Sequence, residues 1–412
     1  MTHPRNLAFL AVATAALAVP GLQAQTTAPR YAVLDYHNTF TSGDGITVRG
    51  NGPDLETGQP FGGTTTVSLG VGAGTRMQFI PGYSVFRAGT VDGTQWDQAN
   101  LGVFSTAFGY NTTASGTFSF AAGVETVAEG DLAFALGYDA KASGAVSFAQ
   151  GYQTVASGDG AVAFGSNTVA AGASSLASGV YSNAGGFGAT ALGYRTTASG
   201  HGATALGNSS QATGLGATAA GIQTIASGRS AAAFGHGTVA RSFGETAAGT
   251  YNVDVTPSSA TAWNAADRLF VVGNGQSASA RSDAFVVFKN GNATIRGTLT
   301  QGSDRSRKTD ILLSDTKAIL TLVGELPIYT WKYQGEDATH LGPMSQDFFA
   351  AFALGATDTG IASVDADGVA LAAIQELKKQ SDAKDARLAS LEARLAELER
   401  QVVALVTAQS AK

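Results

Sequence analysis

A fourteen-residue repeat runs without slippage through the centre of the chain. Glycine recurs at every fourteenth position from Gly109 to Gly249, which encloses ten whole repeats. A second glycine, from Gly116 to Gly228, divides each repeat in half and is replaced only at Ser242. One unit of this length cannot bury its own apolar face, so neighbouring units are expected to stack into a solenoid.

Each repeat is interpreted as two short β-strands and two turns. Alanine stands two residues before each first-register glycine, from Ala107 to Ala247, and a second alanine register runs from Ala114 to Ala240. The intervening residues alternate sides as strands do. So short a coil has room inside only for a methyl group, which explains alanine. Its tight corners need positive φ, which explains glycine.

Larger apolar residues stand just before the first-register glycine, where they are expected to point out of the coil. They are Phe108, Leu136, Phe164, Leu192, Leu206 and Phe234. A repeated outward row of Phe and Leu is typical of association between chains. A monomeric solenoid with a few exposed aromatic residues is the alternative.

The segment Ala-Leu-Gly-Tyr-Arg-Thr-Thr-Ala-Ser-Gly, residues 191 to 200, is similar to the head repeats of YadA-like trimeric autotransporter adhesins. The resemblance covers about residues 102 to 250. It implies a left-handed parallel β-roll in which three chains pack side by side, and hence a homotrimer. It does not extend to the membrane anchor of that family.

The first 24 residues have the pattern of a secretory signal peptide. Arg5 precedes an apolar stretch from Leu7 to Val19, and small residues lead to a cleavage point after Ala24. A buried N-terminal helix is the alternative. No later segment reaches the ~18 apolar residues that span a bilayer, so no transmembrane span is expected. We therefore expect an exported protein, either extracellular or at the cell surface.

Charge and residue types exclude several function classes. A net charge of -6 and a pI near 5.4 argue against a nucleic-acid partner. The chain has no cysteine, so order must come from packing and oligomerisation. The five histidines are scattered, and neither a metal nor another cofactor is expected. A host or surface ligand fits such a fibre, and the sequence leaves its identity open.

The segments that flank the repeats are less regular. Residues 25 to 101 are expected to form an N-terminal cap or head region that covers one end of the roll, with ligand binding there as the alternative. From 251 to 302 the periodicity changes to hairpin-like strands with Asn-Gly turns at Asn274-Gly275 and Asn290-Gly291. We interpret this part as a β connector or stalk.

A serine and a lysine stand five residues apart after the connector, at Ser303 and Lys308. A lysine amine can activate a serine hydroxyl if burial or a nearby cation lowers its pKa. Alone, this spacing is typical of a basic surface turn. Five residues span about 16 Å on a strand and point about 140° apart on a helix. A turn must therefore join the pair, or the lysine comes from another chain, and in either case the site is expected to form only in the trimer.

Motifs downstream of this pair favour a chemical role. They are Leu326-Pro327-Ile328-Tyr329-Thr330-Trp331, the run from His340 to Phe348, and the run from Asp365 to Ala370. A predicted coiled coil follows these motifs in the sequence. Together the motifs, over about residues 303 to 380, resemble the self-cleaving intramolecular chaperone domain of phage endosialidase tail spikes. That domain also occurs on bacterial and eukaryotic trimeric proteins.

The resemblance implies that the Gly302-Ser303 bond is cut by a Ser-Lys dyad. Ser303 would be the nucleophile and Lys308 its base, with Asp304 and His340 in supporting roles. The sequence departs from the family pattern at Ser306-Arg307 and at Ser345.

A heptad pattern follows, interrupted only by Ser381 and Lys384. Its apolar positions are Ile374, Leu377, Leu388, Leu391, Leu395, Leu398, Val402 and Leu405. With Leu388 at heptad position a, arginine residues occupy g positions and glutamate residues occupy e positions. Opposite charges at e and g attract each other between neighbouring parallel helices. A parallel trimeric coiled coil over 381 to 412 is predicted, with a single amphipathic surface helix as the alternative.

The sequence thus predicts a mainly β protein with a trimeric left-handed parallel β-roll, a connector and a small α+β chaperone domain at 303 to 380 that ends in the coiled coil. Its function is that of a surface fibre or adhesin-like protein whose C-terminal module drives trimerisation. That module would then act once as a self-cleaving serine endopeptidase, in cis or within the trimer. The alternative is a non-enzymatic adhesin or structural fibre that keeps its trimerisation domain.

Overall fold

The computed structural model describes residues 72–80 and 83–410. The predicted signal peptide and most of the predicted N-terminal cap lie outside these residues. The chain divides into two compact units, residues 1–298 and 299–412. The first contains the repeats and the connector, and the second contains the candidate site.

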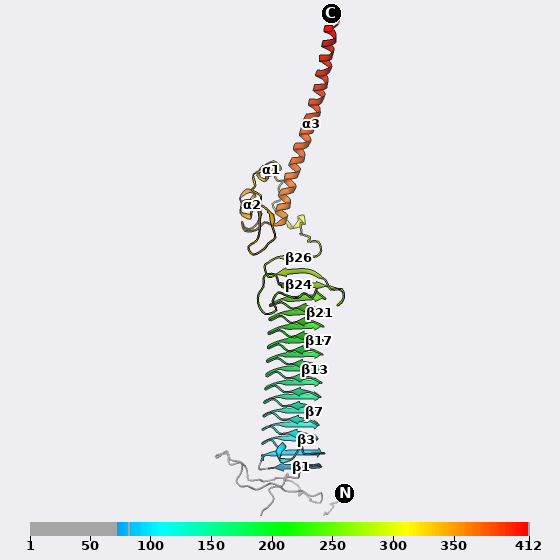
Figure 1. Cartoon of the computed structure of the whole chain (residues 1–412), viewed down its shortest axis with the longest axis vertical. Helices are drawn as coiled ribbons and strands as arrows, with labels where there is room; N and C mark the ends of the chain where they lie inside the picture. The colour runs from blue at the N-terminus through cyan, green and yellow to red at the C-terminus, as the bar shows by residue number, and fades with distance from the viewer. Residues whose placement is uncertain (1–71, 81–82, 411–412) are drawn as a thin grey trace, which may run out of the picture. The chain divides into compact units, whose positions relative to one another are not determined.

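The first unit contains a parallel β-solenoid in which each coil supplies one long and one short strand (Figure 1). The long strands are β3 (Thr106–Tyr110), β5 (Phe120–Val124), β7 (Phe134–Tyr138), β9 (Phe148–Tyr152), β11 (Val162–Ser166), β13 (Leu176–Val180), β15 (Thr190–Tyr194), β17 (Thr204–Asn208), β19 (Thr218–Ile222), β21 (Ala232–His236) and β23 (Thr246–Thr250). The short strands are β4 (Thr113–Ala114), β6 (Val127–Ala128), β8 (Lys141–Ala142), β10 (Val155–Ala156), β12 (Val169–Ala170), β14 (Asn183–Ala184), β16 (Thr197–Ala198), β18 (Gln211–Ala212), β20 (Ile225–Ala226) and β22 (Val239–Ala240).

Neighbouring long strands pair in parallel with the offset of one repeat, so that Thr106 faces Phe120 and Ala107 faces Ala121. Within the described residues, the long strands belong to one 16-stranded sheet and the short strands form a second sheet of ten. This confirms the prediction of two strands and two turns per repeat.

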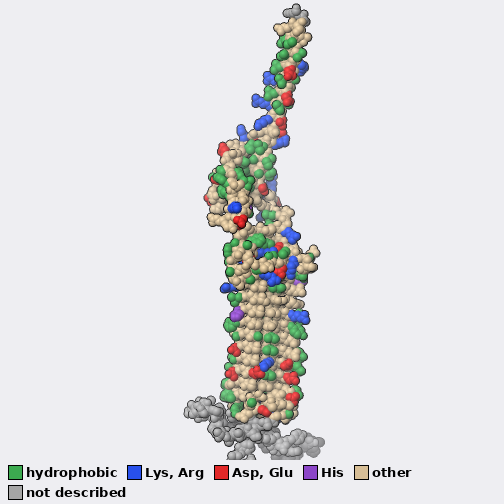
Figure 2. Space-filling model, in the orientation of Figure 1, with side chains coloured by type: hydrophobic (Ala, Val, Ile, Leu, Met, Phe, Trp, Pro, Cys, Tyr) green, Lys and Arg blue, Asp and Glu red, His purple; other side chains and the backbone are tan. Residues whose placement is uncertain are grey.

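The outer face of the long-strand sheet is apolar, as the outward row predicts. Every predicted outward residue is at least partly exposed, and Phe234 is 42% exposed. Aromatic rings from successive coils lie 5.2 to 6.2 Å apart in a ladder formed by Phe108, Phe120, Phe134, Phe148 and Phe164. Hydrophobic side chains are visible along the roll in the space-filling view (Figure 2).

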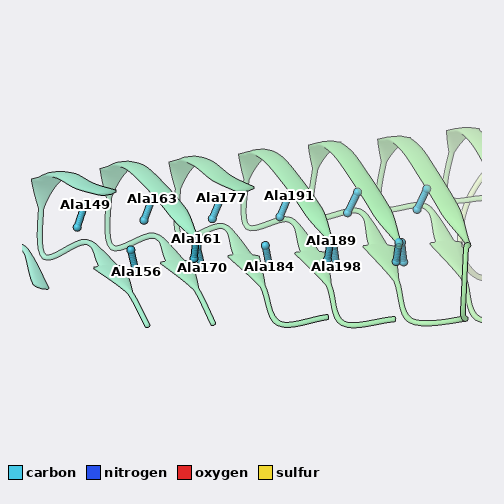
Figure 3. Close-up of a cluster of buried hydrophobic side chains, with 14 of the residues drawn as sticks. Ala149, Ala156, Ala161, Ala163, Ala170, Ala177, Ala184, Ala189, Ala191 and Ala198 are labelled. Carbon is cyan, nitrogen blue, oxygen red and sulfur yellow. The ribbon is translucent and has the colours of Figure 1, made fainter. Parts of the chain in front are cut away.

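The interior of the roll is filled mainly by alanine methyl groups. Both predicted alanine registers are fully buried, and alanines from the two sheets point toward each other in every coil of Figure 3. Two further inward positions hold small residues, such as Ser119 and Thr126. A larger residue would overfill a core of this width.

The two glycine registers have different physical causes. Gly109 has φ +114°, and a Cβ on it would also lie 2.0 Å from the Gly123 carbonyl oxygen. Gly116 does not have positive φ, so the prediction that every corner glycine needs it is wrong. A Cβ there would instead lie 1.9 Å from the Gly130 carbonyl oxygen of the next coil. The last member of this register, Ser242, has no further repeat stacked on it, which explains why serine is tolerated.

Large side chains cover the first coil of the roll. β1 (Gly74–Ile80) and β2 (Val85–Val91) form an antiparallel hairpin, followed by the 3-10 turn η2 (Gln98–Asn100). Arg87 of β2 pairs with Ala107 and is fully buried, where it donates to Ser105 Oγ and to the Ala114 carbonyl. Trp96 is also fully buried, and its indole N–H donates to the Thr112 carbonyl at 2.8 Å.

Asn252 ends the short-strand sheet with its side chain. Its Oδ1 accepts from the Val239 N–H and its Nδ2 donates to the Val239 carbonyl, both at 2.8 Å. The amide therefore makes the two hydrogen bonds that the next short strand would have made.

The connector consists of β24 (Arg268–Asn274), β25 (Asp283–Phe288) and β26 (Ala293–Ile295), paired in antiparallel fashion. Asn290-Gly291 lies in the turn between β25 and β26, as predicted, and Gly291 has φ +93°. Asn274-Gly275 instead begins a longer connection, because β25 does not start until Asp283.

The second unit is a small mixed module with one long helix. It contains the 3-10 turn η3 (Arg305–Arg307), α1 (Thr316–Glu325), the paired strands β27 (Tyr329–Trp331) and β28 (His340–Gly342), α2 (Ser345–Phe352) and α3 (Ser363–Ser410). Thr316 of α1 donates to Glu376 of α3 at 2.9 Å. The heptad positions of α3 are 51 to 68% exposed. The helix of the predicted coiled coil is therefore present, and its partners stay a prediction.

Candidate active site

A short 3-10 turn shapes the segment that follows Gly302. Asp304 begins the turn, because its carboxylate accepts from the Ser306 N–H at 2.8 Å and its carbonyl accepts from the Arg307 N–H at 3.2 Å. Aspartate is a favoured residue at this position, since its side chain satisfies an N–H group that the turn leaves free. The turn reverses the chain just before Lys308.

This reversal brings the predicted dyad together. The Lys308 Nζ donates to the Ser303 Oγ at 2.6 Å. Of the two routes that the spacing allowed, a turn within the chain is the one observed. This hydrogen bond needs no second chain, and the expectation that the complete site forms only in the trimer stays a prediction.

The dyad lies in water in the single chain, since both side chains are exposed. The pKa of Asp304 lies below its ordinary value, chiefly because its carboxylate accepts from the Ser306 backbone N–H, with the Lys308 charge as a smaller cause. Asp304 is thus held as an anion that stabilises the turn, and it is poorly suited to accept a proton.

Two residues beside Gly302 were not assigned a role by the sequence. Gln301 donates from Nε2 to the Ser363 Oγ at the start of α3. Arg307 Nη1 lies 3.9 Å from the point that a Cβ on Gly302 would occupy. Gln301 therefore tethers the chain on one side of the bond, and Arg307 places a positive charge close to it. The contact with Ser363 spans 62 residues, and no local pattern could have indicated it.

His340 lies in β28 and makes no hydrogen bond to Ser303 or Lys308 within the residues that the structure describes. It pairs with Trp331 of β27, and the two rings stack with centroids 4.7 Å apart. Tyr333 contacts the same ring edge to face at 5.4 Å. The His340 Nε2 and the Trp331 Nε1 are buried without a hydrogen-bond partner. The single chain thus brings together Ser303, Asp304 and Lys308, and holds His340 in a separate aromatic cluster.

Residues 72–80 and 83–410 contain no group of three His, Cys, Asp or Glu side chains placed to hold a metal ion. None of the helices in these ranges is long and apolar enough to cross a membrane.

Two protein-family models match the chain. The model described as "Chaperone of endosialidase", a peptidase family, matches residues 303–354, which include the dyad and His340. The model described as "YadA head domain repeat (2 copies)" matches residues 101–126, 128–149, 147–168 and 184–210. A search of curated proteins finds no match to the chain.

The chain is thus similar to YadA head repeats over parts of the roll within residues 101–210, and to endosialidase chaperones over residues 303–354. The chain combines the two in the order that the sequence predicts, with the head repeats first and the chaperone second.

Proposed function

We propose that the protein is an exported, homotrimeric surface fibre whose C-terminal module aligns three chains and then cuts itself off before Ser303. The observation that carries the proposal is the 2.6 Å hydrogen bond between Lys308 and Ser303, directly after the Gly302-Ser303 bond. The match of this segment to a peptidase family supports the same chemistry.

The proposed reaction begins with attack of Ser303 on the bond that precedes it. Its Oγ adds to the Gly302 carbonyl carbon as Lys308, in its neutral form, takes the hydroxyl proton. The bond between this carbon and the Ser303 nitrogen then breaks, and the nitrogen receives the proton from Lys308. An ester joins Gly302 to the Ser303 oxygen, and water hydrolyses it to a Gly302 carboxylate and a free Ser303 hydroxyl. Each chain reacts once.

Arg307 is suited to stabilise the charge that develops during this attack. The carbonyl oxygen of Gly302 becomes an oxyanion, and a cation close to it lowers the barrier. At this departure from the family pattern, Arg307 puts a positive group near Gly302, with its Nη1 3.9 Å from the point that a Cβ on Gly302 would occupy.

Trimerisation is supported by surfaces that one chain leaves in water. The Phe ladder on the long-strand sheet is partly exposed, and the heptad leucines of α3 are exposed. Large exposed apolar surfaces are typical of association. A lysine acts as a base more readily away from water, so we propose that neighbouring chains cover the dyad.

The rival function is a fibre that trimerises and stays whole. The exposure of both side chains in the single chain favours it, because burial away from water is one of the ways in which a lysine becomes a base. Mass spectrometry of the purified protein separates the two functions. Self-cleavage gives a fragment that begins at Ser303, and its absence from a folded trimer would leave only the structural fibre.

A further inference from the structure

The Gly302 carbonyl is the half of the proposed reacting pair that the 3-10 turn does not fix. The Ser303 Oγ is held by the Lys308 amine, but the carbon that it would attack belongs to the residue before the turn. Gly302 has no side chain, and the one atom of the described residues that a Cβ there would meet within 4 Å, apart from its chain neighbours, is Arg307 Nη1. A glycine in such surroundings has great backbone freedom. The approach of oxygen to carbon therefore depends on how the preceding chain is held.

A single hydrogen bond restrains the residues that lead to the proposed cut. Within the part of the chain that the structure describes, residues 299–302 make only the bond from Gln301 Nε2 to the Ser363 Oγ. All four residues are exposed in the single chain, and Leu299 is 64% exposed, so packing does little to hold them. The contact with Ser363 is therefore the restraint that acts on Gly302 from its N-terminal side.

Ser363 belongs to the helix that is proposed to join three chains. It is the first residue of α3, and the first turns of this helix are fixed within the module, where Val369 and Ala373 are buried. Beyond these turns the heptad positions are exposed and available to other chains. The same helix thus holds Gln301 at its start and carries the proposed assembly surface along its length.

We propose that Gln301 is a positioning residue for self-cleavage and that Ser363 is its anchor, so that α3, once three chains set it in place, also sets the carbonyl before Ser303 in reach of attack. The inference rests on the proposed function and adds how assembly acts on the reacting bond. Attack needs the two atoms about 3–3.5 Å apart and aligned, and a small misplacement lowers the rate steeply. Both residues act through Gly302, and neither takes part in the proton transfers.

Rates of self-cleavage in the full-length chain test this role. Gln301→Met keeps the length of the side chain and removes its donor, and Ser363→Ala removes the acceptor. We expect each variant to release the fragment that begins at Ser303 roughly two- to tenfold more slowly, the effect of losing one hydrogen bond that orients the attack. Sedimentation should show the same trimer in both, because neither residue belongs to the heptad run from 374 to 405. The control Thr300→Ala changes an exposed neighbour that makes no hydrogen bond in the described chain, and it should be cut at the natural rate.

Two further variants separate this contact from a general loss of stability. If the two residues act through one hydrogen bond, Gln301→Met/Ser363→Ala should be no slower than either single variant, because the second change has nothing left to remove. Ser363→Thr keeps a hydroxyl acceptor and should restore most of the rate that Ser363→Ala loses. The pH dependence of cleavage should be the same in all these variants, since the proposed base is unchanged.

The outcomes distinguish this inference from the proposed function. A folded natural trimer that never yields the fragment overturns both. If the natural chain is cut and Gln301→Met is cut at the same rate, the positioning role is overturned and self-cleavage stands. Effects that multiply in the double variant, or a Ser363→Thr variant as slow as Ser363→Ala, would mean that the hydrogen bond between the two residues is not what matters, which also contradicts the inference.

Discussion

Lys308 reaches Ser303 across a single 3-10 turn that Asp304 begins. The proposed nucleophile, the proposed base and the residue that begins the turn between them therefore lie within six consecutive residues, 303 to 308. This local origin of the dyad makes its chemistry separable from assembly by mutation.

Ser303→Ala is expected to leave a full-length, folded trimer that is not processed, because the substitution removes the attacking oxygen and little else. Lys308→Arg should also remain uncut, since a guanidinium keeps its proton near neutral pH. Intact mass and sedimentation measure both effects. If Lys308→Arg were cut at the normal rate, lysine would supply only charge, and His340 would be the next candidate for the base.

Breaking the coiled coil tests whether assembly activates the exposed dyad. Leu391→Pro/Leu398→Pro should suppress cleavage, since proline interrupts the helix that aligns three chains. Time courses of fragment release would be compared with those of Ser390→Ala, a substitution outside the a and d positions of the heptad. Efficient cleavage in the proline variant would mean that one chain completes the site alone.

We expect the Asp304 carboxylate to promote cleavage mainly by fixing the turn from Ser303 to Lys308, and less by its negative charge. Asp304→Asn keeps an oxygen that can accept from the Ser306 N–H, whereas Asp304→Ala removes it. We expect Asn to retain much of the cleavage rate and Ala to slow it by roughly tenfold or more, as the turn loosens. Because the pKa of Asp304 is lowered, its contribution should persist from neutral pH and fade only in acid below its ordinary value. Equal rates for the two variants would argue against a positioning role.

Two glycines of adjacent coils should respond differently to alanine. Gly188→Ala meets no atom within 4 Å but keeps φ at +61°, so we expect a cost of about 1–2 kcal/mol. Gly172→Ala places a methyl group 1.9 Å from the Gly186 carbonyl oxygen and must push two coils apart. Its loss of stability in thermal unfolding should be clearly larger. Similar melting temperatures would show that the coils can move apart easily.

Glu245 gives the roll a pH dependence that can be removed. Burial raises its pKa above the ordinary value of 4.5, so the folded chain holds this proton more tightly than the unfolded chain. The stabilisation is complete at pH values below the ordinary pKa of Glu245 and is lost as the pH rises through its raised pKa in the folded chain. Glu245→Gln should flatten this slope in melting temperature. An unchanged slope would assign it to other groups.

The repeat could be predicted in detail because its causes are local and recur in every coil. The positions of Ala107 and Ala121 require a small inward residue, and a strict period reveals this without any knowledge of contacts. The cause of Gly116 could not be derived in this way, since it depends on the Gly130 carbonyl of the neighbouring coil. A gap in the period at Ser242 was the only sign that stacking sets this register.

In the candidate site, too, the features with local causes could be predicted and those that depend on distant parts of the chain could not. The turn from Ser303 to Lys308 is a local structure, and the dyad followed from residue types and a family resemblance. The tether from Gln301 to Ser363 joins parts of the chain that are distant in sequence, and no pattern marks it. The place of His340 beside Trp331 likewise depends on strand pairing over intervening residues.

The hydrogen bonds between Asn252 and Val239 close the stack of coils at one fixed end, while every coil before it offers the same surface above and below. A whole fourteen-residue unit could therefore be added or removed between any two interior coils, because the new neighbours would make the same contacts as the old ones. Each such event would change the length of the fibre by about 4.8 Å, the spacing of paired strands. The length of the roll thus becomes a quantity that gene duplication can adjust in equal steps.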